Sequence, residues 1–571
     1  MNKGSRELLG ALTAAVGARL ESLAKDEFVR RLWEKDPSLW TGDGETAEKI
    51  SNRLGWLDLF PDMRERKEEI RRFASEVRSD SEHVLLLGMG GSSLCPEVMS
   101  LVFGAGGGFP RLSVLDSTDP AAVRAAEVGV APGGTSYVVA SKSGTTAEVD
   151  AFYRYFASRQ SDGSRFLAIT DPGSPLERLG RERGFRKVFL NPPDIGGRYS
   201  ALSFFGLVPA ALLGIDIGRL LSSAEAMGAA SGPSVPPAAN PAVRLGVLLA
   251  EAALAGRDKA TLLFSPEIAP FGAWVEQLLA ESSGKEGKGI LPVHGENLAD
   301  PSAYGEDRFF IFLRYAGTKH SGPDRRVAQI EALGLPIVSM EIEDLHGLGG
   351  EYLRWEIATA VCCSLLGVNA FDEPNVKDSK DRTGAVLRRF EEEGNLGEEA
   401  PLVEDGVLRL YADPGLRPPG GEPSTTSALR AHLERTKRGD FLALLAYLEP
   451  SSENEARLQA IRTDLAERTG LATSLGFGPR FLHSTGQLFK GGPNKGVFLQ
   501  LTAEDEGELP IPGLPYSFGL LKRAQAMGDL EALFAHGRRV VRCHGKGGAA
   551  ELLGRLAEMT RAALSGSERR T

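Results

Sequence analysis

The chain has 571 residues, more than one hydrophobic core usually organises, so several domains are expected. Hydrophobic residues make up 42% and charged residues 25%, and the net charge of −10 argues against nucleic acid or an anionic membrane as the main partner. The four cysteines form no C-x-x-C pair, so neither a disulfide framework nor a zinc site is predicted, and a reducing cytoplasm is the expected location. Apolar runs such as FLALLAYL are too short to span a bilayer.

The first 80 residues have a mostly helical pattern. From residue 83 to residue 191, apolar runs recur with helix-like stretches between several of them: HVLLLG, RLSVLD, SYVVAS, FLAIT and KVFLN. Continuous apolar strands that alternate with helices indicate a buried parallel sheet.

An Ala- and Leu-rich helical stretch covers residues 205–256. A second set of strands then runs from TLLFSP through ILPVHG and FFIFLR to LPIVSM, and the helix WEIATAVCCSLLG follows it. Residues 396–428 are rich in Gly, Pro, Glu and Ser, which predicts an irregular connection. A third α/β pattern follows, with the strands FLALLAYL, GVFLQLT and RRVVRCHG.

These patterns predict an α/β fold with two nucleotide-binding-like αβα sandwiches, each with a parallel sheet, and a C-terminal α/β extension. The expected segments are a helical segment 1–80, a first sandwich 81–215, a second sandwich 216–395 and a C-terminal unit 396–571.

Two strand-to-helix turns, GMGGSS and SKSGTT, carry the strongest chemical signal. Such turns direct backbone N–H groups and the positive end of a helix dipole at one point, which suits a phosphate group and requires no metal. Helix capping is the alternative role for the Ser and Thr residues, and it weighs more for GMGGSS. GMGGSS also lacks the complete G-x-G-x-x-G pattern, so dinucleotide binding is not predicted. The candidate donors in the second turn are Ser141, Lys142, Ser143, Thr145 and Thr146.

The helix after SKSGTT has apolar residues at i, i+3, i+4 and i+7, which predicts a core-facing stripe of Val149, Phe152, Tyr153 and Phe156. A second informative helix, FGAWVEQLLAESS, is expected to end near Gly284. Gln277 and Glu281 are four residues apart on one of its faces. Near the end of a helix, a partly buried glutamate has a raised pKa that suits a general base, whereas a solvated surface glutamate is the alternative.

Six segments resemble signatures of the glucose-6-phosphate isomerase family, which has sugar-isomerase-type domains: GMGGSS, SKSGTTAE, GGRYSALSFFGL, QLLAESSGK, FDEPNVKDSK and HSTGQLFKGG. The N-terminal stretch and FDEPNVKDSK look most like the isomerase half of transaldolase–isomerase fusion proteins. The chain has no room for a transaldolase barrel, so that activity is not implied.

The resemblance implies reversible isomerisation of glucose 6-phosphate and fructose 6-phosphate through a cis-enediol, a step of glycolysis and gluconeogenesis that needs no cofactor. In the family pattern Glu281 is the base that moves the proton between C1 and C2, and Arg198 stabilises the enediolate. His483 and Lys380 open the sugar ring, and Glu148 supports the histidine. The implied substrate contacts are Gly91, Ser92, Ser141, Lys142, Ser143, Thr145, Thr146, Gly197 and Gln277.

One departure from the family pattern is the order of the motifs. The histidine motif usually lies between the base and the lysine motif, whereas His483 follows Lys380 by roughly a hundred residues. In family dimers the histidine comes from the neighbouring subunit, so a homodimer is one expectation. The order of the motifs leaves open whether His483 acts in its own chain.

Three other functions remain as alternatives. An isomerase that also accepts mannose 6-phosphate would use the same residues. A non-catalytic sugar-phosphate-binding regulator would keep SKSGTT without needing Glu281, Arg198 and Lys380 together. An amide-transferring isomerase would need a cysteine after the initiator Met, where this chain has Asn2.

Overall fold

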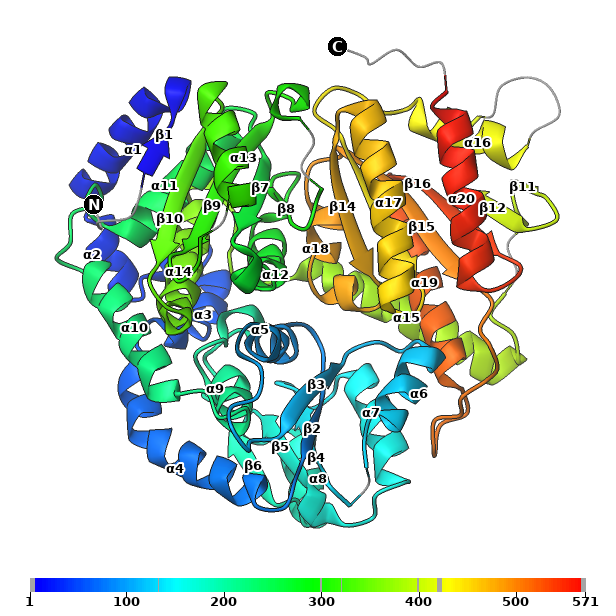
Figure 1. Ribbon diagram of the computed structural model, residues 1–571, viewed down its shortest axis with the longest axis horizontal. Helices are drawn as coiled ribbons and strands as arrows, with labels where there is room; N and C mark the ends of the chain where they lie inside the picture. The colour runs from blue at the N-terminus through cyan, green and yellow to red at the C-terminus, as the bar shows by residue number, and fades with distance from the viewer. Residues whose placement is uncertain are drawn as a thin grey trace.

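The computed structural model describes residues 6–131, 133–297, 300–319, 321–397, 400–417 and 424–565. Within these ranges the strands form three sheets, and each sheet is flanked by helices (Figure 1). The α/β fold predicted from the apolar runs is therefore confirmed. No helix in the described ranges combines the length and apolarity needed to cross a bilayer.

The first sheet has the order β3-β2-β4-β5-β6, and all its neighbouring strands are parallel. The strands are β2 (His83–Gly88), β3 (Arg111–Leu115), β4 (Thr135–Ala140), β5 (Phe166–Thr170) and β6 (Lys187–Leu190). The helices of this first unit are α5 (Leu94–Phe103), α6 (Pro120–Val128), α7 (Ala147–Ala157) and α8 (Pro175–Glu182).

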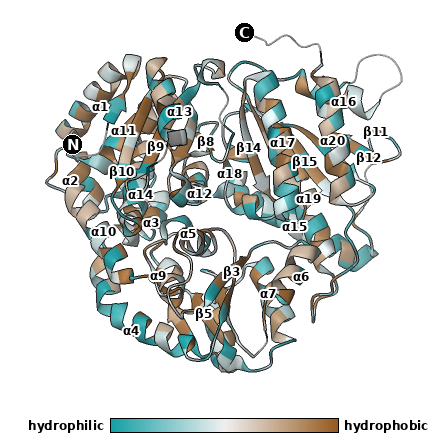
Figure 2. Cartoon of the chain, viewed as in Figure 1, coloured by the Kyte–Doolittle hydropathy of each residue, from teal (hydrophilic) through white to brown (hydrophobic). Residues whose placement is uncertain are grey.

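Both faces of the first sheet are buried, which explains its continuous apolar strands. In β2, Val84 and Leu86 belong to one core cluster, whereas Leu85 and Leu87 belong to another. The second cluster includes the inner face of α7 and also Phe518 from the C-terminal part of the chain. Figure 2 shows apolar residues along the strands, whereas many of the surrounding helices carry both apolar and hydrophilic residues.

The second sheet has the order β1-β10-β9-β7-β8, and only its edge strand β1 is antiparallel. The strands are β1 (Arg6–Leu8), β7 (Lys259–Phe264), β8 (Leu291–Val293), β9 (Arg308–Tyr315) and β10 (Ile337–Ile342). The helices of this second unit are α12 (Phe271–Ser283), α13 (Ser321–Ala332), α14 (Leu348–Leu366) and α15 (Pro374–Glu393).

Helices before and between these two units complete one large core cluster with both sheets. They are α1 (Thr13–Lys25), α2 (Phe28–Trp33), α3 (Gly44–Ser51), α4 (Phe60–Arg78), α9 (Phe204–Leu212), α10 (Ile217–Ala230) and α11 (Pro241–Leu254). The long helical stretch expected at 205–256 is thus divided into α9, α10 and α11.

The third sheet has the order β11-β12-β16-β15-β13-β14, with parallel pairing from β16 to β14. The strands are β11 (Val403–Glu404), β12 (Leu408–Ala412), β13 (Phe441–Tyr447), β14 (Ala472–Phe477), β15 (Gly496–Ala503) and β16 (Arg539–Gly545). The helices of this third unit are α16 (Thr425–Leu433), α17 (Ser452–Thr469), α18 (Gly486–Gly491), α19 (Phe518–Ala535) and α20 (Ala549–Ala563).

The prediction of an irregular connection at 396–428 is wrong in part, because this segment contains β11, β12 and the start of α16. Strand β12 pairs with β16, so tertiary pairing overrides the turn-rich composition. Residues 398–399 and 418–423 of that segment lie outside the described residues.

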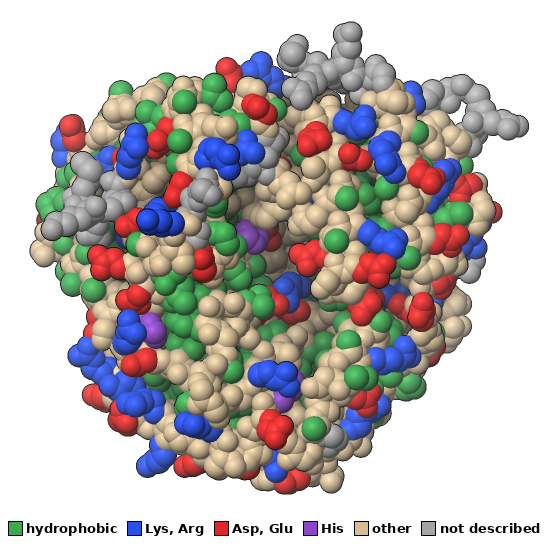
Figure 3. Space-filling view, viewed as in Figure 1, with side chains coloured by type: hydrophobic (Ala, Val, Ile, Leu, Met, Phe, Trp, Pro, Cys, Tyr) green, Lys and Arg blue, Asp and Glu red, His purple; other side chains and the backbone are tan. Residues whose placement is uncertain are grey.

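The third unit packs against both other units through apolar contacts. Phe518 of α19 stacks on Phe152 of α7 at a centroid distance of 6.0 Å. On the other side, Ala280 of α12 and Leu291 of β8 share a core cluster with Phe441 of β13. Figure 1 shows the three units arranged around a common centre, and Figure 3 shows one face hollowed there.

Candidate active site

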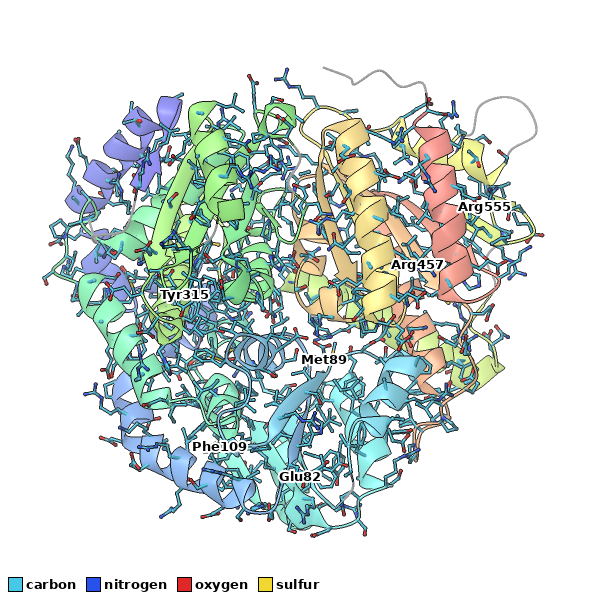
Figure 4. All side chains as sticks on the ribbon, in the orientation of Figure 1. Glu82, Met89, Phe109, Tyr315, Arg457 and Arg555 are labelled. Atoms are coloured by element: carbon cyan, nitrogen blue, oxygen red, sulfur yellow. The ribbon has the colours of Figure 1, made fainter. Side chains whose placement is uncertain are left out.

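Several of the predicted site residues, among them Glu148, Gln277 and His483, lie where the three units meet. Met89 directly precedes the 3-10 turn η4 (Gly90–Ser92) and lies at this centre in Figure 4. The turn η4 follows the carboxyl end of β2, the edge of a parallel sheet where ligands commonly bind. Next to it lie η6 (Gly197–Tyr199), the end of α12 and η10 (Arg480–His483).

Two glycines allow these segments to approach one another closely. A Cβ atom on Gly91 would lie 2.1 Å from the carbonyl oxygen of Gly197, so only glycine permits this contact between the η4 and η6 backbones. Gly90 has a φ of +54°, and a Cβ there would lie 3.1 Å from both Gln277 Nε2 and His483 Cβ. The glycines of GMGGSS therefore bring the first unit into contact with residues of the other two.

Glu281 and Gln277 lie on the same face of α12, as their spacing predicted. The Gln277 side chain donates from Nε2 to Glu281 Oε2 at 3.1 Å. Both residues are buried, with 3% of Gln277 and 7% of Glu281 exposed. Gln277 Oε1 is buried and has no hydrogen-bond partner among the described residues, so this acceptor is unsatisfied.

Burial raises the pKa of the Glu281 carboxyl, and the nearby Arg198 guanidinium opposes this rise. Arg198 Nη1 lies 3.4 Å from Glu281 Oε1, within a buried ion pair. A buried carboxylate with a raised pKa is suited to accept and return a proton near neutral pH.

Arg198 is held firmly by the segments around it. Its Nε donates to Ser282 Oγ at 2.8 Å, and its Nη2 donates to the carbonyl oxygens of Ala370 at 2.8 Å and Asp372 at 2.9 Å. Its Nη1 donates to Glu373 Oε2 at 3.1 Å. The guanidinium is therefore a fixed positive charge beside Glu281, and it fastens η6 to α12 and to the segment before α15.

His483 lies within the site formed by its own chain, although its motif follows the lysine motif. Its Nε2 is 3.1 Å from Glu148 Oε1, and its backbone carbonyl accepts a hydrogen bond of 2.7 Å from Gln277 Nε2. The side chain of His483 is 12% exposed, so a small polar ligand can reach it. The histidine thus comes from the third unit, Gln277 from the second and Glu148 from the first.

Glu148 is in the first turn of α7, where the helix dipole favours a negative charge. Burial alone would raise its pKa, but the charge and hydrogen bond of His483, with a smaller effect of Lys380, lower it to about 2. Glu148 is therefore a carboxylate at neutral pH, and a carboxylate can only accept hydrogen bonds.

The SKSGTT turn presents hydroxyl groups at the start of α7. Ser141 Oγ and Thr146 Oγ1 are 2.9 Å apart, and Ser143 Oγ and Thr145 Oγ1 are also 2.9 Å apart. Ser143 and Thr145 are exposed, whereas Ser141 is buried. Lys142 forms an ion pair with Asp171 and donates to the Pro193 carbonyl at 3.0 Å, so its ammonium group is already partnered.

The two serines of GMGGSS have different environments. Ser93 is fully buried and its hydroxyl donates to the Gly90 carbonyl and to Asp116 Oδ2, both at 3.1 Å, so it stabilises the turn. Among the described residues, the Ser92 hydroxyl has no hydrogen-bond partner and 8% of the residue is exposed. Ser92 is therefore the serine of this turn that is available to a ligand.

Lys380 is exposed on α15 and its side chain has no hydrogen-bond partner within the described part of the chain, but its positive charge contributes to the low pKa of Glu148.

A separate cavity of about 280 Å³ lies between α7 and α8, lined by Gly144, Tyr153 and Leu176 among others. Ser141 and Thr146 line it from one side, but Glu281 and His483 do not.

Two contributors from the third unit were not predicted from the sequence. Arg480, three residues before His483, pairs with Glu97 of α5 and with Asp116, at 2.7 Å and 2.8 Å. Gln525 of α19 donates to Glu148 Oε1 at 2.8 Å. Neither residue is in a recognisable motif.

No group of three or more His, Cys, Asp or Glu side chains in the described ranges is placed to bind a metal.

Comparisons with known proteins connect this geometry to a family. The family model described as phosphoglucose isomerase matches residues 54–297. A probable glucose-6-phosphate isomerase of Haloarcula marismortui is 28% identical over 366 residues, covering 57% of this chain and 82% of the relative. The glucose-6-phosphate isomerase of Citrifermentans bemidjiense is 29% identical over 408 residues, covering 63% of this chain and 75% of the relative. Residues 54–297 are therefore similar to the phosphoglucose isomerase family, as the motifs predicted.

Solved structures agree with this family in fold. A hypothetical protein from Thermus thermophilus has a TM-score of 0.57 at 24% identity, covering 68% of this chain and all (100%) of that protein. A glucose-6-phosphate isomerase from Chlamydia trachomatis has a TM-score of 0.55 at 19% identity, covering 69% of this chain and 90% of that protein. The family match includes Glu148, Arg198 and Glu281, whereas Lys380 and His483 lie beyond its end at residue 297.

Proposed function

We propose that this chain interconverts glucose 6-phosphate and fructose 6-phosphate, by ring opening followed by proton transfer through a cis-enediol. The observation that carries the proposal is the buried Glu281 carboxylate beside the fixed guanidinium of Arg198, 3.4 Å away. A base that has a raised pKa and lies next to a cation is what the reaction needs, because removal of the C2 proton creates an enediolate.

The phosphate group is held at the start of α7. Ser141, Ser143, Thr145 and Thr146 supply hydroxyl groups, and the helix N-terminus supplies partial positive charge. Ser92 reaches the substrate from η4, where Gly91 and Gly197 keep the two turns together. The ammonium of Lys142 is paired with Asp171. Lys142 therefore contributes to phosphate binding through its place in the turn more than through its charge.

Proton transfer then occurs at Glu281. The carboxylate takes the proton from C2 of the open-chain aldose and returns it to C1, while the hydroxyl proton moves between O2 and O1. Arg198 stabilises the negative enediolate oxygens by its charge, and Gln277 Oε1 accepts a hydrogen bond from a sugar hydroxyl.

Ring opening precedes this step. The bond between C1 and the ring oxygen breaks, C1 and O1 form a carbonyl, and one proton moves from the O1 hydroxyl to the ring oxygen. His483 carries this proton, Glu148 holds its ring in place, and Lys380 orients the ring oxygen.

Since His483 lies in the site of its own chain, the proposed reaction does not need a residue from a second subunit. A homodimer stays a prediction, which light scattering of the purified protein tests.

We place the reaction in the cytoplasm, because the four cysteines are buried free thiols, as expected in a reducing compartment.

The decisive experiment is conversion of fructose 6-phosphate, coupled to detection of glucose 6-phosphate, for the wild type and Glu281→Gln. We expect wild-type turnover and a loss of roughly 1,000-fold or more in the variant, since a general base contributes about 10²- to 10⁴-fold. Absence of wild-type turnover would contradict the function. Full activity of Glu281→Gln would contradict the assignment of the base.

A further inference from the structure

Glu148 has a second contact that the mechanism above does not use. The Gln525 side chain donates from Nε2 to Glu148 Oε1 at 2.8 Å, the same oxygen that lies 3.1 Å from His483 Nε2. Gln525 belongs to α19 of the third unit and is 3% exposed. The amide therefore contacts Glu148 from a unit other than the one that carries Glu148.

The orientation of this amide is fixed by another buried residue. The fully buried Thr118 donates from Oγ1 to Gln525 Oε1 at 2.7 Å. An amide oxygen accepts and an amide nitrogen donates, so the contact with Thr118 turns the N–H of Gln525 toward Glu148. Thr118, Gln525, Glu148 and His483 thus form a continuous chain of hydrogen bonds.

This chain determines which nitrogen of His483 carries a proton. An N–H directed at Glu148 favours the ionised carboxylate, which can only accept. His483 Nε2, bonded to that carboxylate, is therefore the protonated nitrogen. His483 Nδ1 remains as the atom that takes the proton from the O1 hydroxyl and returns it to the ring oxygen.

We propose that Gln525 is a positioning residue for ring opening, which holds the Glu148 carboxylate in place and thereby fixes the tautomer and orientation of His483. The proposal rests on the proposed function. It concerns only the ring-opening step, because Gln525 bonds neither Glu281 nor Arg198, the residues assigned to proton transfer between C1 and C2.

The test compares Gln525→Leu with Gln500→Leu. Gln500 is a matched control, because it is a fully buried glutamine of the same unit that donates to the Ala526 carbonyl at 3.1 Å and to Asp529 at 3.2 Å. Ring opening is measured as exchange between the anomers of glucose 6-phosphate by NMR. Proton transfer alone is measured as deuterium incorporation from solvent into 5-deoxyfructose 6-phosphate, which cannot close a furanose ring.

We expect Gln525→Leu to slow anomer exchange by about 10-fold or more and to change deuterium incorporation by less than about 3-fold, since misplaced acid–base groups cost roughly this much. Gln500→Leu should leave the ratio of the two rates unchanged. Gln525→Asn, which keeps the amide but is one methylene shorter, should show the same selective loss and serves if the leucine variant does not fold.

Equal losses in both rates, or identical ratios for the Gln525 and Gln500 variants, would overturn the proposal while leaving the function intact. A wild-type protein that converts neither substrate would overturn both. The two failures are therefore distinguishable in one set of measurements.

Discussion

The side-chain nitrogen of Gln277 lies 2.7 Å from the backbone carbonyl oxygen of His483 and 3.1 Å from Glu281 Oε2. One amide thus joins the proposed base in the second unit to the histidine segment in the third. The contact sets the distance between the groups for the two proposed steps, because Gln277 is almost completely buried and cannot move far.

Replacing Gln277 by Leu should lower kcat for fructose 6-phosphate by roughly 10- to 100-fold, because small displacements of acid–base groups are costly. Part of this expected loss of kcat comes from the proposed hydrogen bond between Gln277 Oε1 and a sugar hydroxyl, which leucine cannot form. Gln459→Leu is the control, since Gln459 on α17 also has a buried amide oxygen without a partner in the described ranges. Equal kinetics of the two variants would contradict this role for Gln277.

The pH profile of kcat/KM should reflect the environment of Glu281. Only the carboxylate form accepts the substrate proton, so activity falls as the pH drops through the pKa of this group. Burial raises that pKa above the ordinary value of 4.5, and the acidic limb of the profile should therefore lie above pH 4.5. A limb at or below this value in steady-state measurements would show that Glu281 is not the group that titrates.

Gly91→Ala should damage both folding and activity. The added methyl group would meet the Gly197 carbonyl at 2.1 Å and force η4 and η6 apart. We expect a decrease of about 1–3 kcal/mol in the free energy of unfolding in urea, the usual cost of overpacking, together with a large loss of turnover. Gly107→Ala is the control, because a Cβ there would meet nothing within 4 Å. The contact would be unimportant if both variants behaved alike.

Arg480→Met should reduce turnover more than an exposed arginine substitution does. Arg480 fastens η10 to Glu97 and Asp116 of the first unit, and its loss leaves two carboxylates without their cation. The matched control is Arg457→Met on α17 (Figure 4), because the Arg457 side chain is 41% exposed and pairs only locally, with Glu453 one turn away. Comparison of kcat/KM and thermal unfolding for both variants tests this; unchanged kcat/KM in Arg480→Met would exclude a role in placing His483.

Much of the fold could be predicted because the strands are buried on both faces and therefore read as continuous apolar runs. Periodicity was less reliable at the level of single residues. The helical periodicity predicts Tyr153 in the core stripe of α7, but Tyr153 is only partly buried, and Tyr155 is fully buried instead. Tyr155 donates to Glu127 at 2.6 Å, a polar contact that the hydrophobic pattern does not reveal.

The candidate site was predictable where residues lie in short motifs, as Glu281 and Gln277 do on one helix face. Gln525 and Arg480 could not be found in this way, because their importance comes from packing between units far apart in the sequence. Gln525 contacts a residue 377 positions away, and nothing in the local sequence of α19 indicates that contact.

The placement of His483 and Glu281 in one polypeptide has a consequence for the concentration dependence of the reaction. Groups tethered in a single chain keep a constant effective concentration with respect to each other, however far the protein is diluted. Apolar packing of Phe518 on Phe152 and of Phe441 near Ala280 restricts the third unit further. Specific activity should accordingly stay constant on dilution to concentrations at which a site shared between subunits would come apart.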